Sequence, residues 1–304
     1  MFVAIAGCDK TGKSTLAREL SKLLYFPVIC RLEPKENIFI ECIDTLTHYK
    51  EPMIIDRFNL DEEVYGPIKR GKSRFDLRQY RLIEMMLTSL NSFNIYTVDS
   101  EDKIKERFIK DNEIYTFKNE IVPILNKYEE AIDNSILNFH RYSIGDSIVS
   151  VAEKIKKQFS RRSLSEILKF REYRTVGNLD GEVLFVAEKY GDKLLPPLIP
   201  FGNNSPGLML FEAFQKGKID LKNIILTNAY KYGMSEKENE KAMIDELQLP
   251  FLKKVICLGT ASYNYVKKIG YENVYKIKHP SYVVSYSNMT VDDYAKEIAE
   301  AYNS

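Results

Sequence analysis

The feature that most constrains the fold of this chain is a short motif near its N-terminus. Residues 7–14 read Gly-Cys-Asp-Lys-Thr-Gly-Lys-Ser and satisfy the pattern G-x-x-x-x-G-K-[ST]. In such a loop the backbone N–H groups curve around phosphates, Lys13 reaches the outer phosphoryl oxygens, and the hydroxyl of Ser14 can hold Mg²⁺. Met1 to Ala6 reads as a buried strand and Thr15 to Leu24 as an amphipathic helix. This strand–loop–helix setting predicts a phosphate-binding loop.

The nucleotide expected at this loop is ATP, with Mg²⁺ as the second cofactor and Ser14 as the metal ligand. The residues predicted to bind ATP run consecutively through the loop into the helix: Gly7, Cys8, Asp9, Lys10, Thr11, Gly12, Lys13, Ser14 and Thr15.

Length and composition indicate two folded domains. The chain has 304 residues, of which 44% are hydrophobic and 29% are charged. A typical domain has about 100–200 residues, so two domains, each with its own core, are expected. The net charge is +1. Any nucleic-acid surface must therefore be a local patch.

Cysteine usage and hydropathy favour the cytoplasm, or the host cytoplasm if the protein is virus-encoded. The cysteines, Cys8, Cys30, Cys42 and Cys257, are far apart and form no C-x-x-C pair. This spacing argues against a disulfide scaffold and against a zinc or iron–sulfur site. No apolar run approaches the roughly 18 residues that a membrane span needs, so no membrane association is expected. The oligomeric state stays open, with a homodimer as one possibility.

Strand-like and helix-like segments alternate through residues 1–158, the first predicted domain. The strands are expected at 26–31, 53–57, 94–98 and 138–143, besides the first, and the helices at 38–49, 76–90 and 148–159. This alternation predicts an α/β fold: a three-layer domain with a parallel sheet that binds its ligand at the carboxyl ends of the strands.

Charged residues follow these strands and are expected to converge on the loop. They are Arg31, Glu33, Asp56, Arg57 and Asp99. Arginines can neutralise a transferring phosphoryl group, and a carboxylate can orient Mg²⁺ or an acceptor hydroxyl. The alternative is that Asp56 and Arg57 are surface residues that cap a strand. Lys105, Arg107 and Lys110 lie in a charged helical segment that predicts either a lid or a solvated helix face.

Several motifs of the first half resemble the thymidylate kinases among the P-loop nucleotide kinases. The loop sequence GCDKTGKST, the R-x-E-P segment at 31–34, Asp56-Arg57 followed by Val64-Tyr65-Gly66, and VDSED at 98–102 carry the resemblance. It implies phosphoryl transfer from ATP to a thymidine-type deoxynucleotide. Residues 35–37 depart from the glycines usual after R-E-P, and 76–90 lacks a clear match to the base-pocket arginine.

The same resemblance implies roles for individual residues. Lys13, Asp9, Asp56, Arg57 and Arg107 would form the catalytic set. The acceptor nucleotide would meet Arg31, Glu33, Asp56, Arg57 and Tyr65, with Asp9 at its sugar and Arg57 at its phosphate. Arg107 or Lys110 would act as the cation of the lid.

Residues 159–180 are predicted to be a basic linker. Arg161, Arg162, Lys169, Arg171 and Arg174 alternate there with Phe170 and Tyr173. Such a mixture could follow a nucleic-acid backbone and stack on bases. A solvated helix with two buried aromatic residues is the alternative.

A second strand–helix pattern occupies residues 181–304. The expected strands are 183–187, 224–226, 254–258 and 273–277, and the expected helices are 207–215, 236–246, 262–269 and 291–302. Polar or small residues, Glu188, Asn228, Gly259 and His279, follow the strands. A second α/β/α domain with a pocket at the strand ends is therefore predicted.

This half resembles the uracil-DNA glycosylase superfamily through AEKYGDK, PFGNNSPG, LTNAYKY, VICLGTASYNYV and HPSYV, in that order. By this resemblance Glu188 would orient water, Phe201 would stack on the base, Asn228 would bind its edge, and His279 would stabilise the leaving oxygen. DNA or a uracil-type base is the implied partner. Base excision and recognition without catalysis both remain open.

Four functions follow from the two halves together. The first is a thymidylate kinase-type phosphotransferase joined to a base-recognition domain. The second is a kinase for a modified pyrimidine in DNA, such as hydroxymethyluracil, whose hydroxyl would be the acceptor. The third is an active uracil-DNA glycosylase with an accessory P-loop domain. The fourth is a nucleic-acid-binding module whose P-loop only senses nucleotide.

Overall fold

The computed structural model describes residues 1–30, 37–110, 118–189, 201 and 205–304. Their contacts divide the chain into two compact units. The first unit comprises residues 1–76 and 90–167, and the second comprises 77–89 and 168–304. Helix α4 (Leu77–Ser89) therefore belongs to the second unit, although its place in the sequence assigned it to the first domain.

A parallel five-stranded sheet forms the first unit, in the order β2-β3-β1-β4-β5. Its strands are β1 (Phe2–Gly7), β2 (Val28–Cys30), β3 (Met53–Asp56), β4 (Phe93–Val98) and β5 (Phe139–Ser143). Its helices are α1 (Lys13–Leu24), α2 (Ile38–His48), α3 (Asn59–Arg70), α5 (Glu101–Lys110), α6 (Ile121–Asp133) and α7 (Ile148–Phe159), with a 3₁₀ turn η1 (Lys118–Glu120). The predicted parallel α/β fold is confirmed for this unit.

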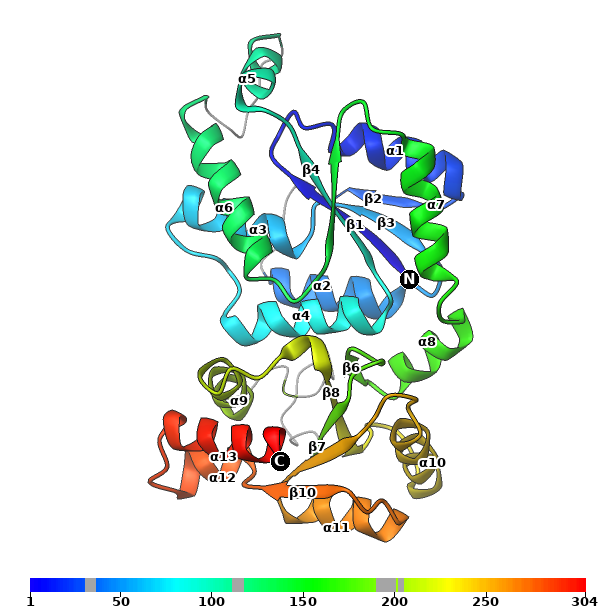
Figure 1. Ribbon diagram of the computed structural model, residues 1–304, viewed down its shortest axis with the longest axis vertical. Helices are drawn as coiled ribbons and strands as arrows, with labels where there is room; N and C mark the ends of the chain where they lie inside the picture. The colour runs from blue at the N-terminus through cyan, green and yellow to red at the C-terminus, as the bar shows by residue number, and fades with distance from the viewer. Residues whose placement is uncertain (31–36, 111–117, 190–200, 202–204) are drawn as a thin grey trace. The chain divides into compact units, whose positions relative to one another are not determined.

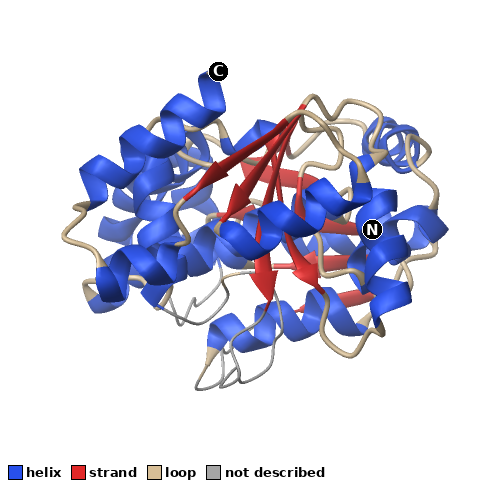
Figure 2. Ribbon diagram, turned by 90° about the horizontal axis from the view of Figure 1, so that it is seen from below, coloured by secondary structure: helices blue, strands red, loops and turns tan. Residues whose placement is uncertain are grey.

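Alternating residues of the central strands face two separate cores. Val3 and Ile5 of β1 pack with Leu16 and Leu20 of α1 and with α7. Ala6 packs on the other side with residues of α3 and α6. Strand side chains alternate between faces, so a fully buried strand requires helices on both sides of the sheet. Figures 1 and 2 show these helical layers on either side of the strands.

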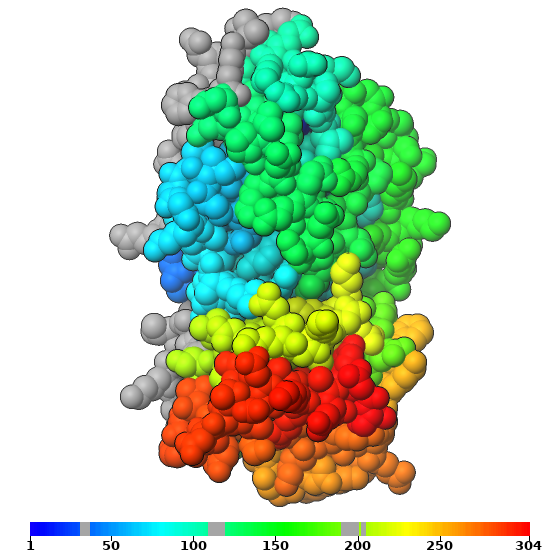
Figure 3. Space-filling view, turned by 60° about the vertical axis from the view of Figure 1, so that its left-hand side comes forward, coloured from blue at the N-terminus to red at the C-terminus, as the bar shows by residue number. Residues whose placement is uncertain are grey.

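The second unit contains another five-stranded sheet, in the order β10-β9-β7-β8-β6. Its strands are β6 (Val176–Gly177), β7 (Val183–Lys189), β8 (Ile224–Tyr230), β9 (Lys254–Leu258) and β10 (Val274–Ile277). Besides α4, its helices are α9 (Ser205–Lys216), α10 (Glu236–Leu247), α11 (Thr260–Ile269), α12 (Pro280–Tyr286) and α13 (Val291–Asn303), with a 3₁₀ turn η2 (Leu221–Asn223). In Figure 3, α12 and α13 form a continuous orange and red surface. Strands β7 to β10 are parallel.

Strand β6 is the exception, because it pairs with β8 in the antiparallel sense. It ends at Gly177, whose φ is 106°, and a Cβ there would lie 2.4 Å from the carbonyl oxygen of Ile224. Only glycine permits this close approach of the edge strand to its neighbour.

The expected basic linker is instead an integral part of the fold. Helix α8 (Leu164–Glu172) spans the boundary between the two ranges, and Phe170 and Tyr173 are buried in the core of the second unit. The hydroxyl of Tyr173 donates to Asp245 Oδ2 at 2.6 Å, and Lys169 pairs with the same carboxylate at 2.9 Å. Neither aromatic ring is therefore available to stack on a base, which agrees with the alternative of a helix with two buried aromatic residues.

Among the helices that the structure describes, none combines the length and the apolar character needed to cross a bilayer.

Candidate functional site

The predicted phosphate loop connects the carboxyl end of β1 to α1, and two glycines shape it. Gly7 has a φ of 150°, and a Cβ at this position would lie 2.2 Å from the hydroxyl oxygen of Thr97 at the end of β4. Gly12 has a φ of 89° and precedes the first residue of α1. The Thr11 hydroxyl lies 2.7 Å from the Cys8 carbonyl and 2.6 Å from the Thr97 hydroxyl. The neighbouring strand therefore helps to fix the curvature of the loop.

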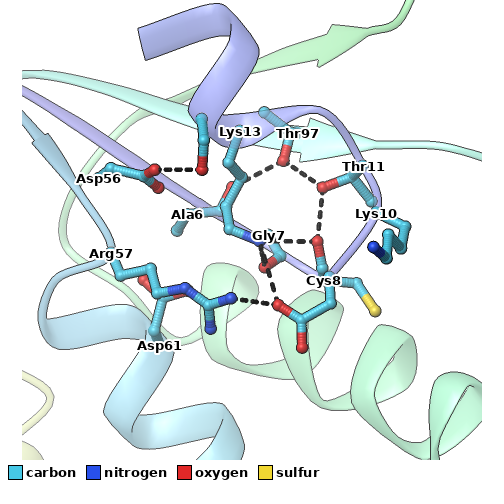
Figure 4. Close-up of polar contacts among 12 residues, drawn as sticks. Ala6, Gly7, Cys8, Lys10, Thr11, Lys13, Asp56, Arg57, Asp61 and Thr97 are labelled. Carbon is cyan, nitrogen blue, oxygen red and sulfur yellow. Dashed lines mark hydrogen bonds and ion pairs between the residues drawn. The ribbon is translucent and has the colours of Figure 1, made fainter. Parts of the chain in front are cut away.

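Lys13 folds back into the loop (Figure 4). Its amino group donates to the carbonyl oxygens of Gly7 and Cys8, each at 2.7 Å, and lies 3.8 Å from Asp9 Oδ1. Burial and the nearby Arg57 guanidinium lower the pKa of Lys13, against the opposing effect of Asp9. A phosphate oxygen would compete with these two carbonyl oxygens for the N–H groups of Lys13, because a phosphate is a stronger acceptor than a carbonyl.

Asp56 provides a carboxylate beside the first turn of α1. Its Oδ2 accepts a hydrogen bond of 2.6 Å from the hydroxyl of Ser14. Asp56 is 2% exposed, and its Oδ1 is buried without a hydrogen-bond partner. A buried carboxylate oxygen without a partner is costly, and Mg²⁺ prefers carboxylate and hydroxyl oxygens as ligands. The pair Ser14 and Asp56 therefore fits a magnesium ion.

Arg57 turns away from Asp56 and pairs with Asp9. Arg57 Nη2 donates to Asp9 Oδ1, and the guanidinium lies 5.7 Å from the centre of the Tyr65 ring. The Tyr65 hydroxyl accepts a 3.2 Å hydrogen bond from the Asp9 N–H. Although burial opposes it, the Asp9 carboxylate raises the pKa of Arg57. The three side chains form one cluster at the carboxyl end of β3 and above the loop.

The backbone of Arg57 is strained. Its φ is 69°, in the left-handed region that non-glycine residues rarely adopt, and its N–H donates to the Ile5 carbonyl at 3.0 Å. Such backbone strain is concentrated at functional sites, where it directs a side chain. Here it lets consecutive residues, Asp56 and Arg57, point to different sides of the loop.

One of the charged residues expected to form a lid, Arg107, contacts the phosphate loop. Arg107 of α5 donates to the Lys10 carbonyl at 2.7 Å and pairs with Asp99 at the end of β4. Although burial opposes it, the hydrogen bond from Arg107 lowers the pKa of Asp99. Lys105 pairs instead with Glu101 on its own helix. Arg31 and Glu33 lie outside the described residues, as does the side chain of Lys110.

The structure adds two residues that sequence reasoning missed. Tyr128 of α6 is fully buried, and its hydroxyl lies 2.8 Å from the Gly7 carbonyl and 2.6 Å from Asp61 Oδ1 of α3. Asp61 Oδ2 also accepts the Phe58 N–H at 2.9 Å. Neither residue belongs to a recognisable motif, because Asp61 lies in α3 and Tyr128 in α6, which are far apart in the sequence.

A second polar cluster lies at the carboxyl edge of the other sheet. Asn228 of β8 is 3% exposed, and its Nδ2 is buried without a hydrogen-bond partner. Glu188 follows directly after Ala187, the residue of β7 that lies opposite Asn228. Gly259 follows β9, and a Cβ there would lie 3.2 Å from the Cβ of His279. The predicted residues at the strand ends of this sheet thus gather around one edge.

A hydrogen bond fixes which ring nitrogen of neutral His279 carries the proton. Its Nδ1 accepts a hydrogen bond of 3.1 Å from the Ser281 N–H. The proton of the neutral ring must therefore be on Nε2. Burial lowers the pKa of His279, and the charge of Glu188 only partly opposes this effect. Phe201, the predicted stacking residue, is buried with a φ of 61°, and the residues on both sides of it lie outside the described ranges.

A buried ion pair supports the end of β8. The side chains of Lys231 and Glu246 are both 0% exposed, and the Lys231 amino group donates to the two Glu246 carboxylate oxygens at 2.9 and 2.7 Å. Lys231 also donates to the Asn228 carbonyl at 2.6 Å, while Thr227 donates to Glu246 Oε1 at 2.6 Å. A buried charge pair is stable only when its remaining hydrogen bonds are made, and here they hold the backbone of Asn228 in place.

Comparison with known proteins gives partial similarities to solved structures. No model of a protein family matches the chain, and no curated protein matches it. The YorR protein of Bacillus subtilis, solved in complex with phosphorylated GDP, is 26% identical, with a TM-score of 0.46; the match covers 53% of this chain and 96% of that one. Deoxyadenosine kinase from M. mycoides, solved with dCMP and dCDP, is 19% identical, with a TM-score of 0.35 and coverage of 53% and 100%. The same enzyme solved with dATP gives the same identity, score and coverage.

Proposed function

We propose that this protein is an ATP- and Mg²⁺-dependent phosphotransferase, with a deoxynucleotide of thymidine type as its acceptor. The observation that carries the proposal is the pair Ser14 and Asp56, in which a buried carboxylate oxygen without a partner lies beside the phosphate loop. A metal there would neutralise charge on the nucleotide phosphates. Ser14 and Asp56 would hold the metal, and Lys13 would exchange its carbonyl acceptors for a phosphate oxygen.

The acceptor side is supported by the cluster of Asp9, Arg57 and Tyr65. The guanidinium of Arg57 reaches Asp9. An arginine can bind a phosphate through two parallel hydrogen bonds, and a carboxylate can orient a hydroxyl. In this proposal Arg57 binds the acceptor phosphate, and Asp9 contacts the acceptor sugar. Arg107 lies across the loop at the Lys10 carbonyl and supplies a further positive charge.

A thymidine-type acceptor is favoured by the motif pattern that accompanies these residues, Asp56-Arg57 followed by Tyr65-Gly66. The second possible acceptor of the same kinase is a pyrimidine in DNA, such as hydroxymethyluracil, because the second unit carries a polar cluster of Glu188, Asn228 and His279 whose groups could bind a base.

The test is transfer of the labelled γ-phosphate of ATP. The full-length protein is incubated with labelled ATP and Mg²⁺, and with dTMP, thymidine, another deoxynucleotide or a duplex that contains hydroxymethyluracil. We expect label in one of the thymidine-type acceptors, and its loss in Lys13→Ala. Asp44→Asn, on the exposed face of α2, is the matched control and is expected to act like wild type. No transfer to any acceptor, with Lys13→Ala indistinguishable from wild type, would refute the kinase.

A second function is favoured by Asn228. Its buried Nδ2 has no partner, and an asparagine side chain complements the donor and acceptor pair of a uracil edge. We propose that the cluster of Glu188, Asn228 and His279 binds a uracil-type base that has been flipped out of DNA. The neutral His279, with its proton on Nε2, can donate to a base oxygen.

Binding and excision are separated by one experiment. An oligonucleotide with a single uracil is treated with the protein and then with alkali, and its binding is measured in parallel. Cleavage at uracil that is lost in Asn228→Ala indicates glycosylase activity, whereas uracil-dependent binding of intact DNA indicates recognition alone. If neither depends on uracil, or if Asn228→Ala changes neither, the proposal for this cluster is wrong.

A further inference from the structure

The Tyr128 hydroxyl makes two short contacts to oxygen atoms but has only one hydrogen to donate. Its hydroxyl oxygen lies 2.8 Å from the Gly7 carbonyl oxygen and 2.6 Å from Asp61 Oδ1. A phenol has one hydrogen, and a carbonyl oxygen can only accept. If Asp61 were an ionised carboxylate, it too could only accept, and one of the two short O···O contacts would contain no hydrogen.

A second hydrogen resolves both contacts. With a proton on Asp61 Oδ1, Asp61 donates to Tyr128, and Tyr128 donates to the Gly7 carbonyl. The other oxygen, Oδ2, remains an acceptor and receives the Phe58 N–H at 2.9 Å. The Asp61 carboxyl oxygens, the Tyr128 hydroxyl and the Gly7 carbonyl are then all satisfied, as buried polar groups require.

The surroundings of Asp61 favour this neutral form. Burial raises the pKa of Asp61, and the positive charges of Lys13 and Arg57 only partly oppose it. The other titratable groups that face it are Tyr128 from α6 and Tyr65 from its own helix. Both tyrosines have their pKa raised by burial and are neutral near pH 7.

We propose that Asp61 is a protonated acid in the resting protein, and that it acts through Tyr128 as a positioning residue for the Gly7 carbonyl of the phosphate loop. This inference rests on the proposed binding of a nucleotide at the loop. Lys13 also donates to the Gly7 carbonyl, and it must leave that carbonyl to reach a phosphate. Tyr128 remains as the donor that fixes the carbonyl after Lys13 has moved.

Loss of the Asp61 proton reverses the hydrogen bond between Asp61 and Tyr128, because the ionised carboxylate can only accept. The Tyr128 hydrogen then turns toward the charged carboxylate, and the Gly7 carbonyl loses a donor. Nucleotide affinity should therefore be highest where Asp61 is protonated, and should fall as pH rises through its folded-state pKa. Titration of Lys13 lowers affinity in the same direction, so a variant must separate the two effects.

Nucleotide affinity as a function of pH is measured for wild type, Tyr128→Phe and Asp61→Asn. We expect Tyr128→Phe to bind ATP about three- to tenfold more weakly, the effect of one lost hydrogen bond. Asp61→Asn supplies a permanent N–H donor to Tyr128, so it should retain the low-pH affinity and lose the component of the pH dependence that belongs to Asp61. Tyr96→Phe is the matched control, because this buried ring stacks on Tyr128 with centroids 5.3 Å apart while its hydroxyl hydrogen-bonds to Glu129 of α6.

An infrared measurement tests the proton without any nucleotide. In protein with ¹³C-labelled aspartate, wild type near neutral pH should show the C=O stretching band of a carboxylic acid, and Asp61→Asn should lack it. If the two spectra agree, or if Asp61→Asn binds ATP as weakly as Tyr128→Phe, Asp61 is ionised and the inference is overturned. Absence of ATP binding in wild type would instead contradict the proposed function, and would leave the infrared result to decide the protonation of Asp61.

Discussion

At the scale of single residues, the two oxygens of Asp56 have different roles. One accepts the hydrogen of Ser14, and the other is buried without a partner. Replacing the carboxylate by an amide keeps the shape but removes the charge and offers N–H groups where a metal ligand is required. We therefore expect Asp56→Asn to lower phosphoryl transfer by about a hundredfold or more.

Magnesium titration identifies the cause of that loss. Asp56→Asn should need a higher Mg²⁺ concentration for half-maximal transfer, while Asp44→Asn should match wild type. An unchanged magnesium dependence in Asp56→Asn would mean that this carboxylate does not hold the metal.

At the scale of elements, the junction of β1 with α1 is fixed by Gly7. A methyl group there would come within 2.2 Å of the Thr97 hydroxyl and 2.6 Å of the Thr97 carbonyl on β4. The backbone of one strand would have to move, so Gly7→Ala should lose nucleotide binding. It should also lower the free energy of unfolding by about 1–3 kcal/mol through overpacking, beyond the cost of an unfavourable φ.

Gly71 provides the matched control for that prediction. Its φ of 77° is also positive, but no atom lies within 4 Å of a Cβ built there. Gly71→Ala should therefore show only the cost of left-handed backbone, about 1–2 kcal/mol, and should bind nucleotide normally. Urea unfolding and ATP titration of both variants provide the comparison. Equal effects of the two substitutions would show that packing against Thr97 does not matter.

Strand β8 and helix α10 are connected by the buried pair of Lys231 and Glu246. Lys231→Met would leave the carboxylate of Glu246 buried without its counter-charge, which should cost about 3–5 kcal/mol. Adding Glu246→Gln should recover part of that loss, because the amide oxygen can still accept from Thr227. Urea unfolding of the single and double variants measures both effects.

A surface pair of the same residue types serves as the control. Lys253 pairs with Glu182, but its side chain is 70% exposed. Lys253→Met should change the free energy of unfolding by less than about 1 kcal/mol. If Lys231→Met had an equally small effect, the buried pair would not be needed for the stability of this unit.

The sequence predicted the regular parts of both units and the convergence of Asp56 and Arg57 on the phosphate loop, and it missed other contacts between distant elements. The phosphate loop and the strands of each sheet lie close to their predicted bounds because buried parallel strands leave continuous apolar runs. Strand β6 has only two residues and carries no such pattern. The positive φ of Arg57 and the meeting of Asp61 with Tyr128 depend on tertiary packing, which local sequence does not encode.

At the scale of the whole molecule, the two polar sites can be removed separately. Lys13→Ala changes the first unit and Asn228→Ala the second. If the acceptor is a free deoxynucleotide, only Lys13→Ala should abolish its phosphorylation. If the acceptor is a base in DNA, each variant should abolish phosphorylation of DNA, because the base must be bound as well as phosphorylated. Assays of both variants with the free deoxynucleotide and with DNA distinguish these two cases. Full activity of Lys13→Ala on both substrates would contradict both cases.

The position of α4 in the chain has a consequence for biosynthesis. This helix packs with β6 and α9 in the second unit, yet the ribosome makes it long before either. Met85, which is buried in the finished protein and whose methyl carbon lies 3.0 Å from a Cβ built at Gly177 of β6, must stay exposed or be covered by a temporary partner while the intervening chain is synthesised. At about 5–20 residues per second this interval lasts several seconds. Newly made chains should therefore depend on chaperones during that interval, even though each sheet is formed mainly from neighbouring segments.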